Sequence, residues 1–412
     1  MAKASPFTLP LPKLGADILS QESSLPKSTV RRAHNVVIDD VGQFDRRPGY
    51  SKIITLPDAH SLWRNADRML VAANGVLYTV DLSANSVTSI FSGLPPHAPV
   101  SYTEVGTDTY FCAPGVLGKI TAAGLVRRPG IANMVGLFPT LTATVGGFPP
   151  GKYGVAYSLL NDLGEESGLS SVSWIDLPSG GGVLLSVLQN ATNVTMMNIY
   201  VTTPDGEDLY LSLTTAIAAT ASLTTLNTLR RASKEHLDPM PGGSIVRYFN
   251  GRLYIADGPW LWISESLDYG LFDVRGGYMT FGRSITMLEP VDAGLYVGFI
   301  DRTLFLAGSG PGQFNQIIIS RRGAVMHSGS MVSADFFGED VVPERGKPVA
   351  VWLSEVGMAV GRQNGSVAYP QSKRIRTAQA DKARPLFARR NGYAQGIFCG
   401  ATTDTGAVDQ TT

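Results

Sequence analysis

The stretch that decides the fold is Asn250–Asp257 (NGRLYIAD), because an earlier part of the chain repeats its pattern. Asn74–Asp81 (NGVLYTVD) is identical to it at five positions with the same spacing, and Ala293–Phe299 (AGLYVGF) is a weaker third copy. In each copy a glycine supplies the positive φ of a tight turn, and the side chains that follow alternate between the two faces of a strand. The repeat therefore predicts antiparallel hairpins.

Short apolar runs surround each copy and form units of three or four strands. These units begin near residues 60, 100, 245, 285 and 349, and a repeat of roughly 40 residues with several strands is typical of a β-propeller blade. The spacing is irregular, since Leu253 and Leu295 lie 42 residues apart but Leu77 and Leu253 lie 176 apart. The sequence therefore predicts an all-β fold, a β-propeller whose circle is interrupted.

The interruption, residues 136–235, has strand signals of its own. Several short alternating runs, with Trp174 as a candidate core residue, are typical of an immunoglobulin-like or fibronectin type III-like β-sandwich. The run 223–233 reads as either one short helix or a linker. The predicted organisation is a docking arm at 1–32, propeller blades at 33–135, the inserted sandwich at 136–235, further blades at 236–400 and a flexible tail at 401–412.

Composition narrows the class of protein. The 412 residues contain 34 Lys and Arg against 34 Asp and Glu, so the formal net charge is zero, which argues against bulk-charge binding to nucleic acid or anionic membranes. Cys112 and Cys399 are too few for a disulfide framework, and we expect both to be buried and reduced. Because no run reads as a signal peptide or a membrane-spanning helix, we expect a soluble protein made in a cytoplasm.

Sequence motifs for catalysis are hard to find. The five histidines fall in no zinc-binding spacing, and the glycine-rich stretches open no helix, so we expect no metal site, no cofactor site and no catalytic residues. The acidic pairs Asp39-Asp40 and Glu165-Glu166 suggest glycosidase chemistry at first sight. Adjacent residues of a strand point to opposite faces, however, so neither pair is expected to flank one bond.

Two basic groups are the candidate contact sites. Arg46 and Arg47 follow an apolar strand near the N-terminus, and residues 371–390 hold seven basic side chains against one acidic one. Either group suits contact with an acidic partner or with passing DNA, while a solvated face or an ordinary subunit interface is the alternative. The residues selected as assembly or DNA-channel contacts are Arg46, Arg47, Lys373, Arg374, Arg376, Arg384, Arg389 and Arg390.

Asn35–Tyr50 (NVVIDDVGQFDRRPGY) resembles a recurrent N-terminal signature of the tail nozzle, or packaged-DNA stabilisation, proteins of tailed phages. Tyr153–Ser167 is similar to the inserted sandwich of that family, and Arg252–Pro290 is similar to its later blades. The similarity covers residues 33–310, and nothing after about residue 320 matches the family's pattern.

The resemblance implies a structural virion protein without enzymatic activity or cofactor. It implies a homo-oligomeric ring, often a hexamer, assembled in the bacterial host cytoplasm and attached below the portal or adaptor among other tail proteins. The lumen of such a ring retains and conducts DNA without reading its sequence, and no membrane insertion is involved.

Three alternatives stay open at this point. The chain could occupy another place on the virion, as a tail-tip hub, a collar protein or a receptor-binding protein. It could be a carbohydrate-binding or carbohydrate-degrading propeller, in which Trp260, Trp262 and Tyr269 stack on sugars, although alternating aromatic residues in a strand are usually core. A cytoplasmic scaffold propeller is the third alternative.

Overall fold

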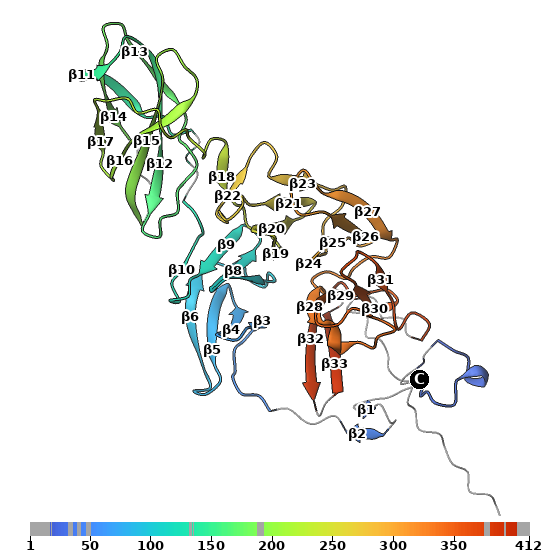
Figure 1. Cartoon of the computed structure of the whole chain (residues 1–412). Helices are drawn as coiled ribbons and strands as arrows, with labels where there is room; N and C mark the ends of the chain where they lie inside the picture. Colours follow the sequence, from blue (N-terminus) through green and yellow to red (C-terminus); the bar gives the residue numbers. More distant parts are fainter. Residues whose placement is uncertain are drawn as a thin grey trace, which may run out of the picture. The chain divides into compact units, whose positions relative to one another are not determined.

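A computed structural model describes residues 17, 19–31, 36–38, 43–46, 51–131, 134, 136–187, 193–374, 380–390 and 393–401. Within these residues, 33 strands are joined by turns, loops and two short 3-10 helices, Glu22–Ser24 and Ala334–Phe336 (Figure 1). The all-β prediction is confirmed, and the strands form many small antiparallel sheets. In this part of the chain, no helix has the length and apolar character needed to cross a membrane.

The chain forms two compact units, which are described separately. Unit 1 comprises Met1–Pro57, Val80–Val87 and Gly282–Thr412, and unit 2 comprises Asp58–Thr79 and Thr88–Phe281.

Two antiparallel sheets, which belong to unit 2 apart from Val80–Val87, follow the chain order strand by strand. The strands of the first sheet are β3 (His60–Arg64), β4 (Met69–Ala73), β5 (Val76–Asp81) and β6 (Ser86–Ser92). Those of the second are β7 (Ser101–Val105), β8 (Asp108–Ala113), β9 (Val116–Ile120) and β10 (Val126–Arg127). Each sheet is therefore a four-stranded meander, in keeping with the three or four strands expected for each unit.

The third meander of unit 2 contains the repeated stretch Asn250–Asp257. It consists of β19 (Ile245–Phe249), β20 (Arg252–Asp257), β21 (Trp260–Ile263) and β23 (Tyr278–Thr280), while β22 (Leu271–Asp273) pairs instead with β18 (Leu237–Pro239). Asn250 and Gly251 join β19 to β20 with φ of 45° and 78°, and Asn74 and Gly75 join β4 to β5 with φ of 48° and 77°. Positive φ at both turn residues matches the right-handed twist of a tight hairpin, which is why Asn-Gly recurs here.

The three meanders pack face to face in chain order. Leu70 and Leu77 of the first sheet share a buried apolar cluster with Tyr102 and Phe111 of the second. The other face of the second sheet, through Cys112, belongs to a cluster with strands β19 and β20. Each sheet is thus buried against its neighbours, and the stacking rather than any single sheet supplies the core.

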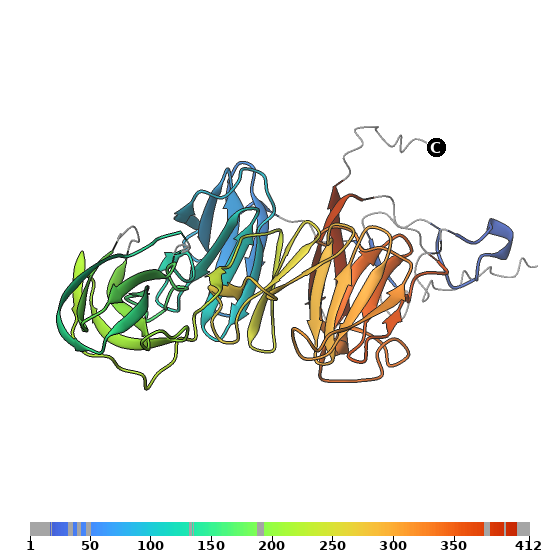
Figure 2. The same ribbon diagram turned by 90° about the horizontal axis from the view of Figure 1, so that it is seen from above.

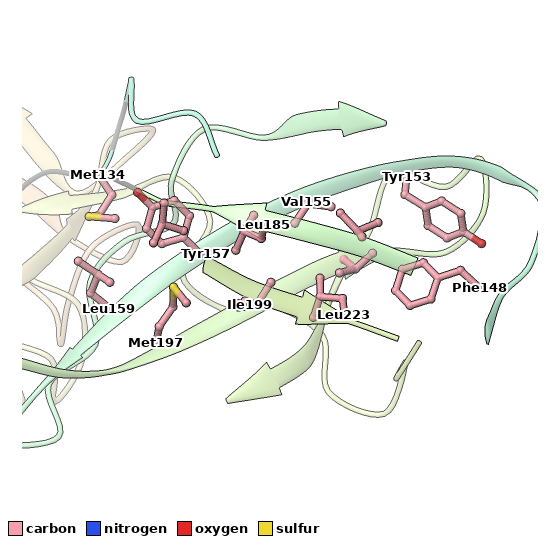
Figure 3. Packing of buried hydrophobic residues seen from close by; sticks show 14 of the residues in the cluster. Met134, Phe148, Tyr153, Val155, Tyr157, Leu159, Leu185, Met197, Ile199 and Leu223 are labelled. Carbon is pink, nitrogen blue, oxygen red and sulfur yellow. The ribbon is translucent and has the colours of Figure 1, made fainter. Parts of the chain in front are cut away.

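A two-sheet β-sandwich interrupts the meanders between β10 and β18. One sheet has the order β11 (Thr140–Phe148), β14 (Gly181–Ser186), β17 (Thr220–Leu223), and the other has the order β13 (Ser173–Leu177), β12 (Gly151–Asn161), β15 (Val194–Thr202), β16 (Leu209–Ala216). Alternate residues of β12, among them Tyr153, Tyr157 and Leu159, enter the core between the sheets (Figure 3). Phe148 lies beside Tyr153 at one end of this layer, with ring centroids 5.1 Å apart.

One sequence expectation about this insertion needs correction, and one alternative that the sequence left open is decided. Trp174 is not in the core, because it pairs with Gly154 on the outer face of its sheet, is 48% exposed and has the Lys152 ammonium 5.2 Å from its ring. The run 223–233 forms no helix: β17 ends at Leu223 and the rest is a linker, held by backbone bonds such as Ala232 N–H to Leu209 O. Ile175 and Leu177 of the same strand pack in the core, so the alternation of side chains places Trp174 on the outer face.

Unit 1 contains two further meanders, drawn as side-by-side orange strands in Figure 2. They are β24 (Met287–Val291), β25 (Gly294–Gly298), β26 (Thr303–Ala307), β27 (Asn315–Ser320), and β28 (Ser330–Ser333), β29 (Pro348–Ser354), β30 (Gly357–Gly361), β31 (Val367–Ala368). Their shared core centres on Tyr296, Phe305 and Trp352. Tyr296 and Trp352 are fully buried with ring centroids 5.4 Å apart, and the Tyr296 hydroxyl donates to the carbonyls of Arg362 and Ser366.

Candidate functional site

The hairpin formed by β32 (Lys382–Arg390) and β33 (Tyr393–Ala401) carries four of the seven basic residues between positions 371 and 390. The two strands pair without a register shift from Lys382 opposite Ala401 to Arg390 opposite Tyr393. Because side chains alternate along a strand, Lys382 and Arg384 share one face while Ala383 and Phe387 share the other. Over the described side chains, one face of the hairpin is apolar, and the other carries Lys382 and Arg384 together with Leu386 and Ile397.

The apolar face anchors the hairpin to unit 1. Ala383 is buried, and its N–H donates to the carbonyl of Met326 at 3.0 Å. The Phe387 ring meets Phe336 edge to face at 6.1 Å and Phe398 at 6.0 Å, and both Phe387 and Phe398 pack against the valine cluster of β28 and β29. These contacts fix which face of the hairpin points outward.

The opposite face carries the two described cations of the hairpin. Lys382 is exposed, Arg384 is half-buried, and Leu386 is 59% exposed. Cys399, directly across from Arg384, is exposed as well, so the prediction that both cysteines are buried holds only for Cys112. The thiol of Cys112 donates to the carbonyl of Gly243 at 3.0 Å inside unit 2, whereas position 399 falls on the outward side of its strand.

The other selected cations lie on different elements. Lys373 is exposed and Arg374 half-buried in a turn after β31, and Arg46 is exposed at the end of β2 (Phe44–Arg46), which pairs with β1 (Val36–Ile38). Arg47 and Arg376 lie outside the described residues, as do the side chains of Arg389 and Arg390, whose backbone belongs to β32. A role for these residues in DNA contact or assembly stays a prediction.

Arg374 belongs to a small electrostatic group with the N-terminal segment. The backbone N–H and hydroxyl of Ser20 donate to the carboxylate of Asp17 at 3.0 and 2.8 Å, and the N–H of Leu19 donates at 3.1 Å. These hydrogen bonds, the one from the Ser20 backbone foremost, lower the pKa of Asp17, and the charge of Arg374 adds to the effect. Part of the cationic charge of the 371–374 turn is thus balanced within the chain.

A second surface feature is an aromatic cluster on β21 and β23. The rings of Trp260 and Trp262 stack with centroids 5.5 Å apart and planes 15° apart, and the Tyr278 ring lies edge-on to Trp260 at 5.5 Å. Tyr269, which the sequence grouped with the two tryptophans, packs instead against Tyr110 and Tyr248. Strand β21 pairs with β23, although 14 residues separate the two strands, and this pairing brings Tyr278 into the cluster. No local sequence pattern predicts the pairing.

The turn after β12 joins the sandwich to the second meander of unit 2. Lys119 of β9 lies with its Nζ 3.0 Å from Asp108 Oδ2 and 3.3 Å from Glu165 Oε1. The Arg127 guanidinium forms a forked ion pair with the carboxylate of Asp162. Burial by itself lowers the pKa of Lys119, but the hydrogen bond to Asp108 and the charge of Glu165 outweigh it, so the pKa is raised.

Glu165 and Glu166 point to different partners, as their adjacency predicts. Glu165 faces Lys119, whereas Glu166 Oε1 accepts hydrogen bonds from Ser158, Asn198 and Tyr200 on the outer face of the sandwich. Burial and the hydrogen bond to Glu166 raise the pKa of Tyr200. The two carboxylates therefore do not flank a common bond, and Glu166 is the hub of a saturated polar network.

A groove in unit 1 is a further surface feature. A polar groove of about 370 Å³ in unit 1 is lined by two acidic and two basic side chains, and the pair Lys347–Asp292, at 2.7 Å, lies within it. This balance of charge favours no charged ligand. Among the described residues, no three His, Cys, Asp or Glu side chains are grouped closely enough to hold a metal ion.

Comparison with known proteins places the chain in no family. No family model and no curated protein matches the sequence. Similar solved structures are β-propeller-like proteins. The N-terminal domain of Nup159 has 9% identity and a TM-score of 0.31 over 84% of this chain and 73% of that chain. BBS1N in complex with ARL6DN has 10% identity and a TM-score of 0.29 over 84% and 93%.

Kluyveromyces lactis Hsv2 has 7% identity and a TM-score of 0.26 over 81% of this chain and 86% of that chain. TM-scores near 0.3 are too low to assign a common topology, and identities near 10% carry no functional information. What the chain does must therefore be argued from its own residues.

Proposed function

We propose that the chain is an interrupted β-propeller with an inserted immunoglobulin-like sandwich, and that it is a structural virion protein of a tailed phage. In this proposal it forms a ring, of six copies, below the portal or adaptor, and the ring retains and conducts DNA. The fold part is supported by the four-stranded meanders, which pack face to face in chain order within each unit as propeller blades do. The functional part is supported by the resemblance of Asn35–Tyr50 to the nozzle family.

The observation that carries the DNA role is the two-faced hairpin β32–β33. Phe387 anchors one face of the hairpin, so the other face, with Lys382 and Arg384, points in a fixed direction. The hairpin backbone therefore does not have to be ordered when these side chains contact a phosphate backbone. A ring repeats this strand around its axis. Because the whole chain is electrically neutral, the contacts attract DNA locally while the protein does not trap it.

The assembly role is supported by the outer strand of the first meander of unit 1. β27 is the last strand of its sheet and pairs with β26 alone, and its sequence NQIIIS carries no charge. Ile317 and Ile318 are both exposed on it. Natural edge strands usually bear charges that block pairing with another chain, so an uncharged and exposed edge suits a subunit contact.

The salt dependence of DNA binding tests the DNA role. Binding of the assembled protein to a random-sequence duplex is measured by fluorescence anisotropy at several salt concentrations. Each phosphate contact that Lys382→Ala removes is expected to reduce the slope of log K against log salt by about 1. Arg64→Ala, at an exposed cation on β3, is the matched control and keeps the wild-type slope. An unchanged slope for Lys382→Ala contradicts the DNA-facing assignment of the hairpin.

The position on the virion needs a separate test, because a tail-tip hub, a collar protein or a receptor-binding protein could have the same fold. Symmetry separates these positions: a nozzle follows sixfold order, and a tail-tip hub follows threefold order. Uniform binding to unrelated duplexes is expected in the nozzle position, since backbone contacts carry no sequence information.

A further inference from the structure

We infer that the aromatic cluster of β21 and β23 is a carbohydrate-binding platform that takes one pyranose ring of a neutral polysaccharide. The platform consists of Trp260 and Tyr278 together with Asp257 and Thr280, the two polar residues that flank Trp260. It involves none of the residues proposed above for DNA contact or assembly, so it stands or falls independently of the proposed function.

The strand sequence WLWI builds the platform. Leu261 and Ile263 are fully buried on one face of the sheet, and this fixes Trp260 and Trp262 on the other. Trp262 is half-buried and meets the buried Phe272 edge to face at 5.2 Å. The inner tryptophan is therefore part of the core, and Trp260 is seated on it at the rim.

Trp260 presents one open ring face. Its nearly parallel stacking on Trp262 covers the other face, and Tyr278 closes one side at 65°. Trp260 and Tyr278 are each 38% exposed. The result is a flat apolar surface with a wall. Because the neighbouring rings hold the indole in place, a ligand does not have to immobilise it.

The neighbours of Trp260 across the sheet are polar. Asp257 is its partner on β20 and Thr280 is its partner on β23, and both are exposed on the same face. Directly paired residues have their Cβ atoms about 5 Å apart, so a carboxylate and a hydroxyl border the ring on opposite sides. A carboxylate accepts hydrogen bonds from two vicinal hydroxyl groups, and a threonine hydroxyl both donates and accepts.

This combination fits a sugar better than the other ligands that aromatic residues bind. A pyranose has an apolar C–H face that lies flat on an indole and a rim of hydroxyls that reaches polar neighbours. A quaternary ammonium is held best among several ring faces turned toward it. Here the parallel stacking of Trp260 and Trp262 leaves only one of their faces free, which suits a ring laid flat.

Affinity electrophoresis of the intact chain through gels that contain dextran, mannan or arabinogalactan tests the inference. We expect retardation by at least one of the three, and Trp260→Ala weakens that association by about tenfold. Asp257→Asn weakens it without removing any ring. Trp174→Ala is the matched control, because Trp174 is also exposed but lies on the outer face of the sandwich.

Three outcomes overturn the inference. The first is migration unaffected by all three polysaccharides. The second is retardation that Trp260→Ala and Trp174→Ala weaken equally, which indicates nonspecific aromatic contact. The third is retention on choline-agarose that Trp260→Ala abolishes while no polysaccharide binds, which identifies a cation site instead. Failure of this test leaves the DNA and ring proposals untouched, because neither uses Trp260.

Discussion

Lys119 and Glu165 join two structural elements of unit 2, since the ammonium of a meander strand lies 3.3 Å from the carboxylate of a sandwich turn. Asp108 completes the group at 3.0 Å on the other side of the ammonium. The three side chains are mostly shielded from solvent, so their charges are compensated by one another rather than by water. The sandwich is thereby fixed to the meander at the turn that the sequence marks as Gly-Glu-Glu-Ser.

Lys119→Gln is expected to destabilise unit 2 by about 1–3 kcal/mol, because Asp108 and Glu165 then face each other without a cation. Urea denaturation measures the loss. The double variant Lys119→Gln/Glu165→Gln removes one of the stranded carboxylates and is expected to recover part of it, with a coupling energy of about 0.5–3 kcal/mol. Strictly additive effects of the two substitutions contradict the proposed link.

The ion pair of Arg127 and Asp162 predicts a pH dependence. The hydrogen bond from Arg127 lowers the pKa of Asp162 in the folded chain, so this pair contributes its full stability above the ordinary aspartate value, about 3.9, and loses it as pH falls through the lower folded value. Thermal unfolding is expected to show that the wild type has a higher melting temperature than Asp162→Asn. This gap in melting temperature is expected to be constant above about pH 5 and to narrow below about pH 4. In an Arg127→Gln background the gap should lose this pH dependence. A gap that persists unchanged at about pH 3 argues against the pair.

Gly361 is required by the core of unit 1. A Cβ at this position would lie 2.7 Å from the Tyr296 ring and 2.9 Å from the Trp352 ring. The hydrogen bonds of the Tyr296 hydroxyl, at 2.6 and 2.9 Å, prevent that ring from moving away. Gly361→Ala is therefore expected to lower the stability of unit 1 by about 1–3 kcal/mol in chemical denaturation.

Gly310→Ala is the control for this substitution, because a Cβ there meets no atom within 4 Å. The control is expected to stay within about 0.5 kcal/mol of the wild type. Equal behaviour of the two variants would mean that the aromatic core tolerates the extra methyl group.

The edge strand β27 predicts a variant that stays monomeric. Ile318 is 63% exposed, so Ile318→Lys leaves the fold intact but places a charge on the edge that another subunit would have to cover. Light scattering coupled to gel filtration is expected to show a ring for the wild type and a monomer for this variant. Leu229→Lys is the control, because this side chain is 92% exposed in a linker, and it is expected to form an assembly with the same molar mass as the wild type. A ring that forms equally well with Ile318→Lys excludes β27 as the contact.

Local patterns predict much of the fold, because hairpins depend on neighbours in sequence. The Asn-Gly turns at 74–75 and 250–251 and the alternating strands around them follow from backbone preference and side-chain periodicity. The positions of Trp174, Tyr278 and Cys399 do not. Each position depends on which face of a sheet is covered. That face is decided by a partner strand or sheet distant in sequence, which a short-range pattern cannot identify.

The candidate sites show the same division. The basic character of 371–390 is visible in the sequence, but its separation into a turn and a two-faced hairpin depends on the contact of Phe387 with Phe336, some 50 residues away. Lys119 and Glu165 are 46 residues apart and carry no motif that links them. Long-range charge pairing and face selection are therefore the parts that require the folded chain.

Cryo-electron microscopy of particles from the source lysate tests the central claim most directly. The account predicts that the chain traces into a closed sixfold ring between the portal and the tail tip, with β27 in the contact between neighbours and the Lys382–Arg384 face of β32 toward the DNA. A peripheral position, or a ring whose lumen is lined by other strands, would contradict the assignment of the hairpin. Absence of the chain from the particles would contradict the virion role itself.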